Sequence, residues 1–132
     1  MKGGCLCGAV RYETRVAPTY SGFCHCRDCQ KATGTGHYCY MIFDKGDVVV
    51  TGTTRSFAIF SNSGRETTRR FCETCGSQIF GGGAPEDPRL SIYAGTLDDP
   101  EEFRPSDAVF VRSRRHWDHV TLELNEHETL PA

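Results

Sequence analysis

The spacing of the cysteines constrains this chain more than any other feature. Seven of its eight cysteines fall into three tight clusters, at Cys5–Cys7, Cys24–Cys29 and Cys72–Cys75. One or two intervening residues let two sulfurs reach one ion, as in zinc sites, whereas a disulfide between cysteines one residue apart would be strained. Gly8 and Gly76 directly follow the two pairs. We expect them to take a positive φ, which would curl each loop and turn backbone N–H groups toward the sulfurs.

Seven thiols divide most naturally into a set of four and a set of three. A closed set of four ligands is structural, whereas three protein ligands leave a position open for a substrate. The two pairs resemble each other, since each ends in glycine, and together they predict a structural zinc site: Cys5, Cys7, Cys72 and Cys75. Such closure would join distant parts of the chain and stabilise a small core. The remaining three are Cys24, Cys26 and Cys29. Three thiolates on zinc suit a soft fourth ligand, such as a substrate thiol, whose pKa the zinc would lower.

The length and the strand-like patterns predict a single β domain. A chain of 132 residues fits one domain, 1–132, and we expect a loose tail from about residue 126. Apolar and polar residues alternate at 10–16, as in a half-buried strand. Similar runs lie at 37–43, 47–51, 55–60, 67–71, 77–80, 89–94, 108–112 and 120–124. One helical turn is expected at 26–32. Many short strands with turns between them, such as 61–64, predict a sandwich or a barrel-like pair of sheets.

Charge and hydropathy argue against two classes of partner. Fifteen basic and seventeen acidic side chains nearly cancel, which is atypical of a nucleic-acid binder. The densest basic stretch, Arg112 to Arg115, is expected to be a solvated strand end. No apolar run reaches the roughly 18 residues of a membrane span, and the start of the chain lacks the apolar segment of a secretory signal. We therefore expect a cytoplasmic protein with reduced thiols and no membrane partner.

Five stretches of the sequence resemble the glutathione-dependent formaldehyde-activating enzymes, a family that includes the centromere protein V group. They follow one another over most of the chain, at 3–12, 24–34, 71–78, 94–100 and 112–117. The resemblance implies a β-tent of short antiparallel strands. It also implies structural zinc on Cys5, Cys7, Cys72 and Cys75, and a second zinc on Cys24, Cys26 and Cys29 beside a glutathione site. The implied activity is that of a carbon–sulfur lyase, in which formaldehyde and glutathione combine reversibly to give S-hydroxymethylglutathione.

Several side chains outside the two sets have more than one interpretation. Arg27 and Lys31 lie close to the three-cysteine cluster in sequence, where they could receive a glutathione carboxylate or form solvated surface. His25 is expected to point away from the sulfurs, with a proton shuttle or an occasional metal ligand as the alternatives. Cys39 is expected to be a small buried hydrophobe. In the alternative, Cys39 or His37 adds a fourth ligand to the cluster.

Other functions remain as alternatives to the enzyme. One is a non-catalytic, zinc-stabilised module that binds a small thiol or a protein partner. Another is a redox enzyme such as a B-type methionine sulfoxide reductase, which needs a reactive cysteine late in the chain. No cysteine follows Cys75, which argues against this chemistry. Chromatin binding has only the kinship to centromere protein V in its favour, and the near-neutral charge argues against it.

Overall fold

The computed structural model describes residues 1–61 and 63–131, and in this part the chain is mostly β-structure. The strands are β1 (Lys2–Gly4), β2 (Arg11–Thr14), β3 (Tyr20–Cys24), β4 (Tyr38–Asp44), β5 (Val48–Thr51), β6 (Thr54–Phe60), β7 (Glu66–Cys72), β8 (Gln78–Gly82), β9 (Arg89–Tyr93), β10 (Asp107–Val109) and β11 (Asn125–Glu126). The α-helix is α1 (Arg27–Thr33), and the 3₁₀ helices are η1 (Lys45–Asp47), η2 (Ala94–Thr96), η3 (Pro100–Glu102) and η4 (Val111–Ser113). Within the described residues, no helix is long and apolar enough to cross a membrane. The turn predicted at 61–64 includes Asn62, which lies outside the described residues.

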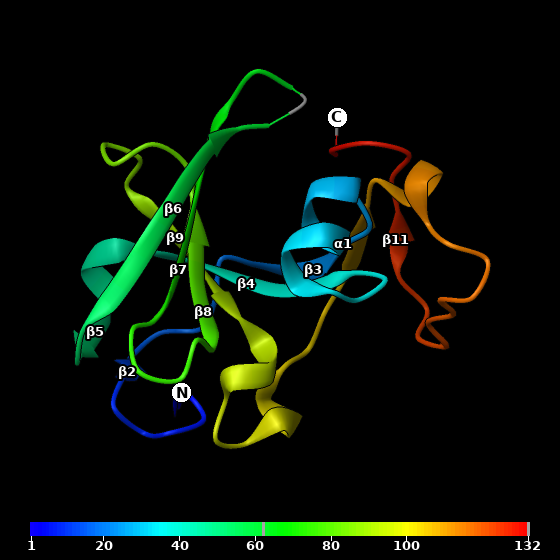
Figure 1. Ribbon diagram of the computed structural model, residues 1–132. Helices are drawn as coiled ribbons and strands as arrows, with labels where there is room; N and C mark the ends of the chain where they lie inside the picture. The colour runs from blue at the N-terminus through cyan, green and yellow to red at the C-terminus, as the bar shows by residue number, and fades with distance from the viewer. Residues whose placement is uncertain (62, 132) are drawn as a thin grey trace.

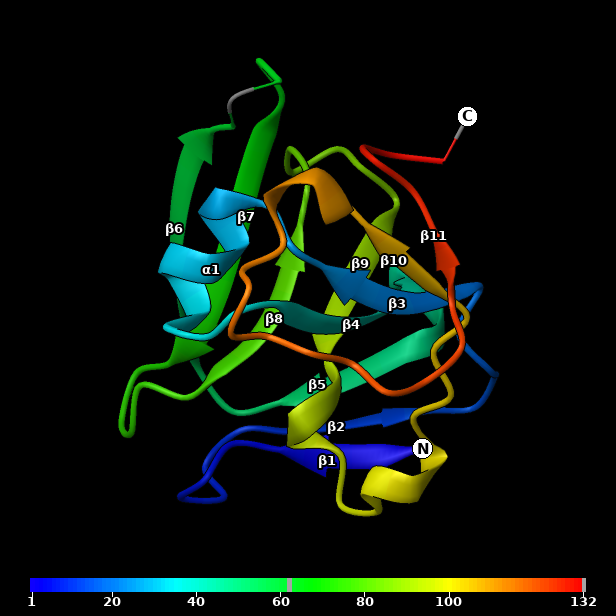
Figure 2. The same cartoon turned by 90° about the vertical axis from the view of Figure 1, so that its right-hand side faces the viewer.

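The strands form two sheets. The smaller has the order β1-β2-β5, and the larger has the order β11-β10-β3-β4-β9-β8-β7-β6. In both views β3 and β4 run across the molecule while β6 and β7 run upright, so the larger sheet is strongly twisted (Figures 1 and 2). The prediction of a mainly β fold with two sheets is confirmed. Most strand pairs are antiparallel, and β10 departs from this pattern by pairing in parallel with both β3 and β11.

The strands predicted from alternating patterns correspond to β2 and to β4 through β10, with ends shifted by a few residues. The predicted helical turn is α1. A strand predicted at 120–124 is absent, and the short strand β11 begins only at Asn125. Val120, Leu122 and Leu124 alternate as strand residues do, yet this segment forms no strand and Leu122 is 56% exposed. Strands β1 and β3 were not predicted, since both contain glycine and neither alternates.

The expected loose tail is held to the larger sheet for several residues beyond β11. The backbone N–H of His127 donates to the carbonyl of Ala108 at 2.9 Å. The N–H of Phe110 donates to the carbonyl of Thr129 at 3.0 Å. These bonds extend the ordered pairing past residue 126, where we expected the chain to leave the fold.

Strand β4 is covered on both of its faces, which explains its continuous run of large side chains. Because successive side chains point to opposite faces, Met41 and Phe43 lie on one side and Tyr38 and Tyr40 on the other. The first side joins the main core, which fills the space between the two sheets. This core also contains Val10, Tyr12, Ile79, Phe80, Ile92, Ala94 and Leu97. The second side belongs to a separate aromatic cluster that includes Tyr93, Val109 and two of the cysteines, Cys24 and Cys29. One strand thus connects the structural core to the candidate site.

Candidate active site and metal centres

Four cysteines from distant parts of the chain come together, as the sequence predicts. Cys5 and Cys7 lie in the loop between β1 and β2, Cys72 ends β7, and Cys75 lies in the turn before β8. Their sulfurs all lie within 4.8 Å of one another. The Sγ atoms of Cys5 and Cys7 are 3.5 Å apart, and those of Cys7 and Cys72 are 3.8 Å apart. Sulfurs bound tetrahedrally to zinc at about 2.3 Å lie about 3.8 Å apart, so this donor set fits a zinc ion.

Backbone geometry around the two pairs also matches the expectation from sequence. Gly8 and Gly76 have φ angles of 81° and 76°, in the region that favours glycine. The Val10 N–H donates to the Cys5 sulfur at 3.2 Å, which lowers the pKa of that thiol. The Ser77 side chain lies 3.1 Å from the Cys75 sulfur and lowers the pKa of Cys75 to about 5. These hydrogen bonds favour the thiolate form, which is the form that binds metal.

The second cluster is assembled by the junction of β3 and α1. Cys24 ends β3, and Cys26 caps the helix by accepting a hydrogen bond from the N–H of Cys29 at 3.3 Å. The three sulfurs lie within 4.8 Å of one another, with Cys24 and Cys29 buried and Cys26 half-buried. Hydrogen bonds from Cys24 and Cys29 hold the pKa of Cys26 well below its ordinary value. This arrangement offers three thiol ligands for a metal.

A positive charge next to this cluster comes from Arg69, which the sequence analysis did not identify. Its guanidinium donates to the Tyr93 hydroxyl at 2.7 Å and to the Cys29 sulfur at 3.5 Å. It also lies 5.7 Å from the centre of the Tyr38 ring. Arg69 is in β7, 40 positions from Cys29, and no local motif marks it. Only the pairing order β7-β8-β9-β4 brings the two together.

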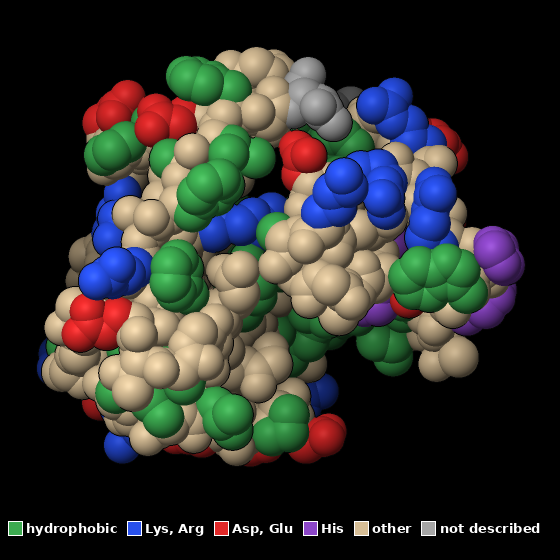
Figure 3. All heavy atoms as spheres, viewed as in Figure 1, with side chains coloured by type: hydrophobic (Ala, Val, Ile, Leu, Met, Phe, Trp, Pro, Cys, Tyr) green, Lys and Arg blue, Asp and Glu red, His purple; other side chains and the backbone are tan. Residues whose placement is uncertain are grey.

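The three-cysteine cluster lies in the wall of a large open cavity of about 950 Å³. The cavity extends from α1 and the aromatic face of β4 to β7 and the loop before β9. Its charged lining residues are Arg27, Arg65, Arg69, Arg89 and Arg112, with Asp28, Glu66, Glu86 and Asp87. Figure 3 shows basic side chains around the hollow between the β6–β7 side and the α1 side. The site therefore combines thiols, an aromatic floor and cations suited to carboxylate groups.

The two basic residues predicted near the cluster lie in different places. Arg27 lines the large cavity and donates to the Gln30 side chain. Lys31 is exposed and lines a neighbouring cavity of about 360 Å³ between α1 and strands β6 and β7. A molecule bound at the cysteines in the large cavity would therefore meet Arg27 more directly than Lys31.

The other residues with alternative interpretations are His25, His37 and Cys39, and none of them belongs to the group of three sulfurs. His25 is fully buried, and its Nδ1 lies 3.4 Å from an Asp118 oxygen. His37 also contacts Asp118, through its Nδ1 at 2.8 Å. Cys39 packs beside the main core, and burial raises its pKa to about 11. Among the described residues, neither Cys39 nor His37 belongs to the group formed by the three cysteines.

Comparisons with known proteins agree with this geometry. Residues 1–113 match the family model described as glutathione-dependent formaldehyde-activating enzyme. A protein of Halomonas elongata, provisionally named as such an enzyme, is 28% identical over 134 residues, covering 97% of this chain and 84% of that relative. A crystal structure of a Rhodobacter sphaeroides protein is similar with a TM-score of 0.59 at 20% identity, over 77% of this chain and 94% of that one. The structural similarity supports the fold.

Proposed function

Since the chain belongs to the glutathione-dependent formaldehyde-activating enzyme family, we propose that it is a zinc-dependent carbon–sulfur lyase acting on adducts of glutathione and an aldehyde. With formaldehyde, the reaction would form or release S-hydroxymethylglutathione. The observation that carries this proposal is the position of Cys24, Cys26 and Cys29 in the wall of a cavity lined by arginines. Zinc and glutathione are the proposed cofactor and co-substrate.

The charges of the cavity complement those of glutathione. Glutathione has two carboxylates and one ammonium group besides its thiol. Arg112 and Arg65 are exposed at the cavity lining, where they would receive carboxylates, and Arg27 lies next to the cysteines. Glu86 and Glu66 on the same lining would receive the ammonium group. The thiol would then point toward the three-cysteine cluster.

The reaction requires the protein only to ionise the substrate thiol and to orient it toward the aldehyde. The sulfur of the substrate thiolate attacks the aldehyde carbon, a C–S bond forms, the C=O π bond breaks, and the oxygen takes a proton from water. In the reverse direction hydroxide takes the hydroxyl proton to give water, the C=O π bond re-forms, and the electrons of the breaking C–S bond leave on sulfur as the thiolate. Zinc bound by the three cysteines would stabilise the thiolate form of the substrate. Arg69, held between Tyr93 and Tyr38, adds a fixed positive charge where the thiolate would lie.

Exchange spectroscopy tests the proposed activity directly. ¹³C-formaldehyde and glutathione are brought to equilibrium with their adduct, and the exchange rate is measured with and without zinc-loaded protein. We expect the protein to accelerate exchange and Cys26→Ser to abolish the acceleration while leaving the fold intact. The matched control is Cys39→Ser, because Cys39 is a half-buried cysteine outside both clusters and its loss should preserve the rate.

A second variant tests whether the arginines recognise carboxylates. Arg112→Gln removes one cation from the cavity lining without touching the cysteines. We expect it to raise KM for glutathione with a smaller effect on kcat, since the interaction is made in the ground state as well as in the transition state. Exchange that stays at the uncatalysed rate, together with tight glutathione binding, would instead favour the thiol-binding module.

A further inference from the structure

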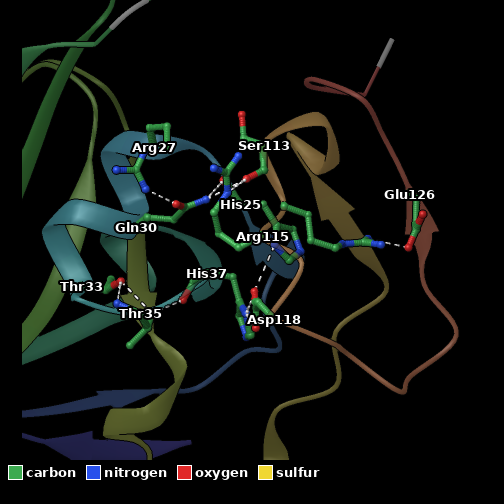
Figure 4. A network of polar contacts seen from close by, with 11 residues as sticks. His25, Arg27, Gln30, Thr33, Thr35, His37, Ser113, Arg115, Asp118 and Glu126 are labelled. Atoms are coloured by element: carbon green, nitrogen blue, oxygen red, sulfur yellow. Dashed lines mark hydrogen bonds and ion pairs between the residues drawn. The ribbon is translucent and has the colours of Figure 1, made fainter.

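A third cluster of metal-ligating side chains has no member in the lining of the cavity that the proposed reaction uses. It consists of His25 at the β3–α1 junction, His37 just before β4, and Asp118 in the turn after η4. Figure 4 shows both imidazoles directed at the Asp118 carboxylate. The three residues come from segments distant in sequence, since His37 and Asp118 are 81 positions apart. The fold alone brings them together.

The distances in this cluster match those between ligands of one metal ion. The Nδ1 atoms of His37 and His25 lie 2.8 Å and 3.4 Å from the same Asp118 oxygen. One ligand atom from each residue lies within 4.8 Å of the others. Two ligands that are each about 2.1 Å from an ion, at the angles of octahedral or tetrahedral sites, lie about 3.0–3.4 Å apart. A small adjustment would therefore place an ion between them.

The ring of His25 supplies a second observation, because its nitrogens have no hydrogen-bond partner. Its side chain is fully buried, and neither ring nitrogen makes a hydrogen bond with the described residues. A buried polar group without a partner is costly, and such groups in folded proteins are nearly always satisfied by protein, water or an ion. An ion bound at Nδ1 would satisfy one of the two nitrogens. His37 could share that ion by carrying its proton on Nε2.

The surroundings of Asp118 leave room for its carboxylate and limit opposing charge. A Cβ at Gly36 would lie 2.4 Å from the Asp118 Cγ, so only glycine at this position allows the carboxylate to lie where it does. Asp118 is 12% exposed and His37 22% exposed, so the cluster is reachable from outside. The nearby Arg114 contacts Glu126, which offsets its charge.

We propose that His25, His37 and Asp118 form a third metal site, for a first-row divalent transition-metal ion. Two imidazoles and one carboxylate are ligands that suit nickel, iron(II) and zinc, and the set differs from the all-sulfur clusters. The site lies outside the cavity that would hold glutathione. A test of this metal site is therefore independent of any test of the proposed lyase activity.

Nickel binding to the zinc-loaded protein tests this site. The protein is dialysed against NiCl₂, and nickel and zinc are counted in the same sample by mass spectrometry. We expect the wild type to take up one nickel ion per chain without losing zinc, and Asp118→Asn to lose this nickel. His119→Asn is the matched control, because His119 is an exposed neighbour outside the cluster and its variant should keep the nickel. Nickel on nitrogen and oxygen should lack the intense sulfur-to-metal absorption that nickel on thiolates would give.

Two results would overturn the site. One is a wild type that takes up no nickel, and the other is uptake that rises only as zinc falls. A thermal scan adds a readout that does not depend on counting ions, because a ligand that binds only the folded state raises Tm. Nickel should raise the Tm of the wild type and of His119→Asn. It should leave the Tm of Asp118→Asn unchanged. Should Asp118→Asn fail to fold, as judged by circular dichroism, His37→Gln replaces it, with the same loss expected.

Discussion

Arg69 shows how one side chain can set the charge of a site assembled from another part of the chain. Its guanidinium is fixed by the Tyr93 hydroxyl and lies against the Cys29 sulfur. A cluster of thiolates is more stable next to a cation, so Arg69→Met should weaken zinc binding at the three-cysteine cluster by about tenfold or more. Competition with a chelator measures this affinity. Arg70→Met, at the exposed neighbour, is the control, and equal losses in both variants would contradict a specific role for Arg69.

Gly76 tests the backbone geometry of the four-cysteine cluster at a single residue. Its φ of 76° is unfavourable for any residue with a Cβ, although no atom would clash with one there. Gly76→Ala should therefore cost about 1–2 kcal/mol of unfolding free energy through backbone strain alone. Urea unfolding of the zinc-loaded protein measures the loss. Gly46→Ala is the control, since Gly46 has open space and no positive φ, and its variant should be nearly neutral.

At the scale of elements, α1 depends on one buried side chain to hold it against the C-terminal half. Gln30 donates to the carbonyls of His25 and Ser113, at 2.7 Å and 3.0 Å. Gln30→Ala would leave both carbonyls without this donor, at a cost of about 1–3 kcal/mol. Urea unfolding checks this, with the exposed neighbour Lys31→Ala as the control. Similar small changes for both variants would show that α1 is held by its other contacts.

The elements that sequence patterns predict are those whose burial is local and regular. Strand β4 alternates between two buried faces and α1 follows the cysteine motif, so both were found. Strand β3 was missed because four of its five residues are buried and Gly22 interrupts the pattern. Gly22 is needed there, since a Cβ would lie 2.6 Å from the Asp107 carbonyl oxygen of β10. The parallel pairing of β10 with β3 joins residues about 85 positions apart, which no local pattern can indicate.

As with the strands, local sequence patterns predict some features of the candidate site and not others. The sequence predicts how the cysteines group, because short spacings and the following glycines are local properties. It does not predict that Arg69 contacts Cys29, or that His37 and Asp118 meet behind His25. Those contacts depend on the order of strands in the larger sheet and on the path of the chain after η4. Arg27 lines the cavity together with the three cysteines, because it lies within the cysteine motif itself.

At the scale of the molecule, the two cysteine clusters should differ in how much each contributes to the stability of the fold. The set of four connects the loop after β1 to the turn between β7 and β8, across the main core. Cys72→Ser should therefore lower the unfolding free energy by several kcal/mol, whereas Cys26→Ser should cost much less, because metal at a folding-linked site contributes directly to stability. Thermal unfolding of both variants, compared with wild type before and after chelation, measures the difference. Equal losses would contradict the division into structural and functional sets.

The central claim is that the three-cysteine cluster receives the thiol of glutathione inside the arginine-lined cavity. Calorimetric titration of the zinc-loaded protein with glutathione, and with S-methylglutathione as a ligand that lacks the thiol, tests it most directly. The account predicts one glutathione bound per chain, much weaker binding of S-methylglutathione, loss of binding in Cys26→Ser and wild-type binding in Cys39→Ser. Equal affinity for the two ligands, or undiminished binding of glutathione by Cys26→Ser, would contradict it.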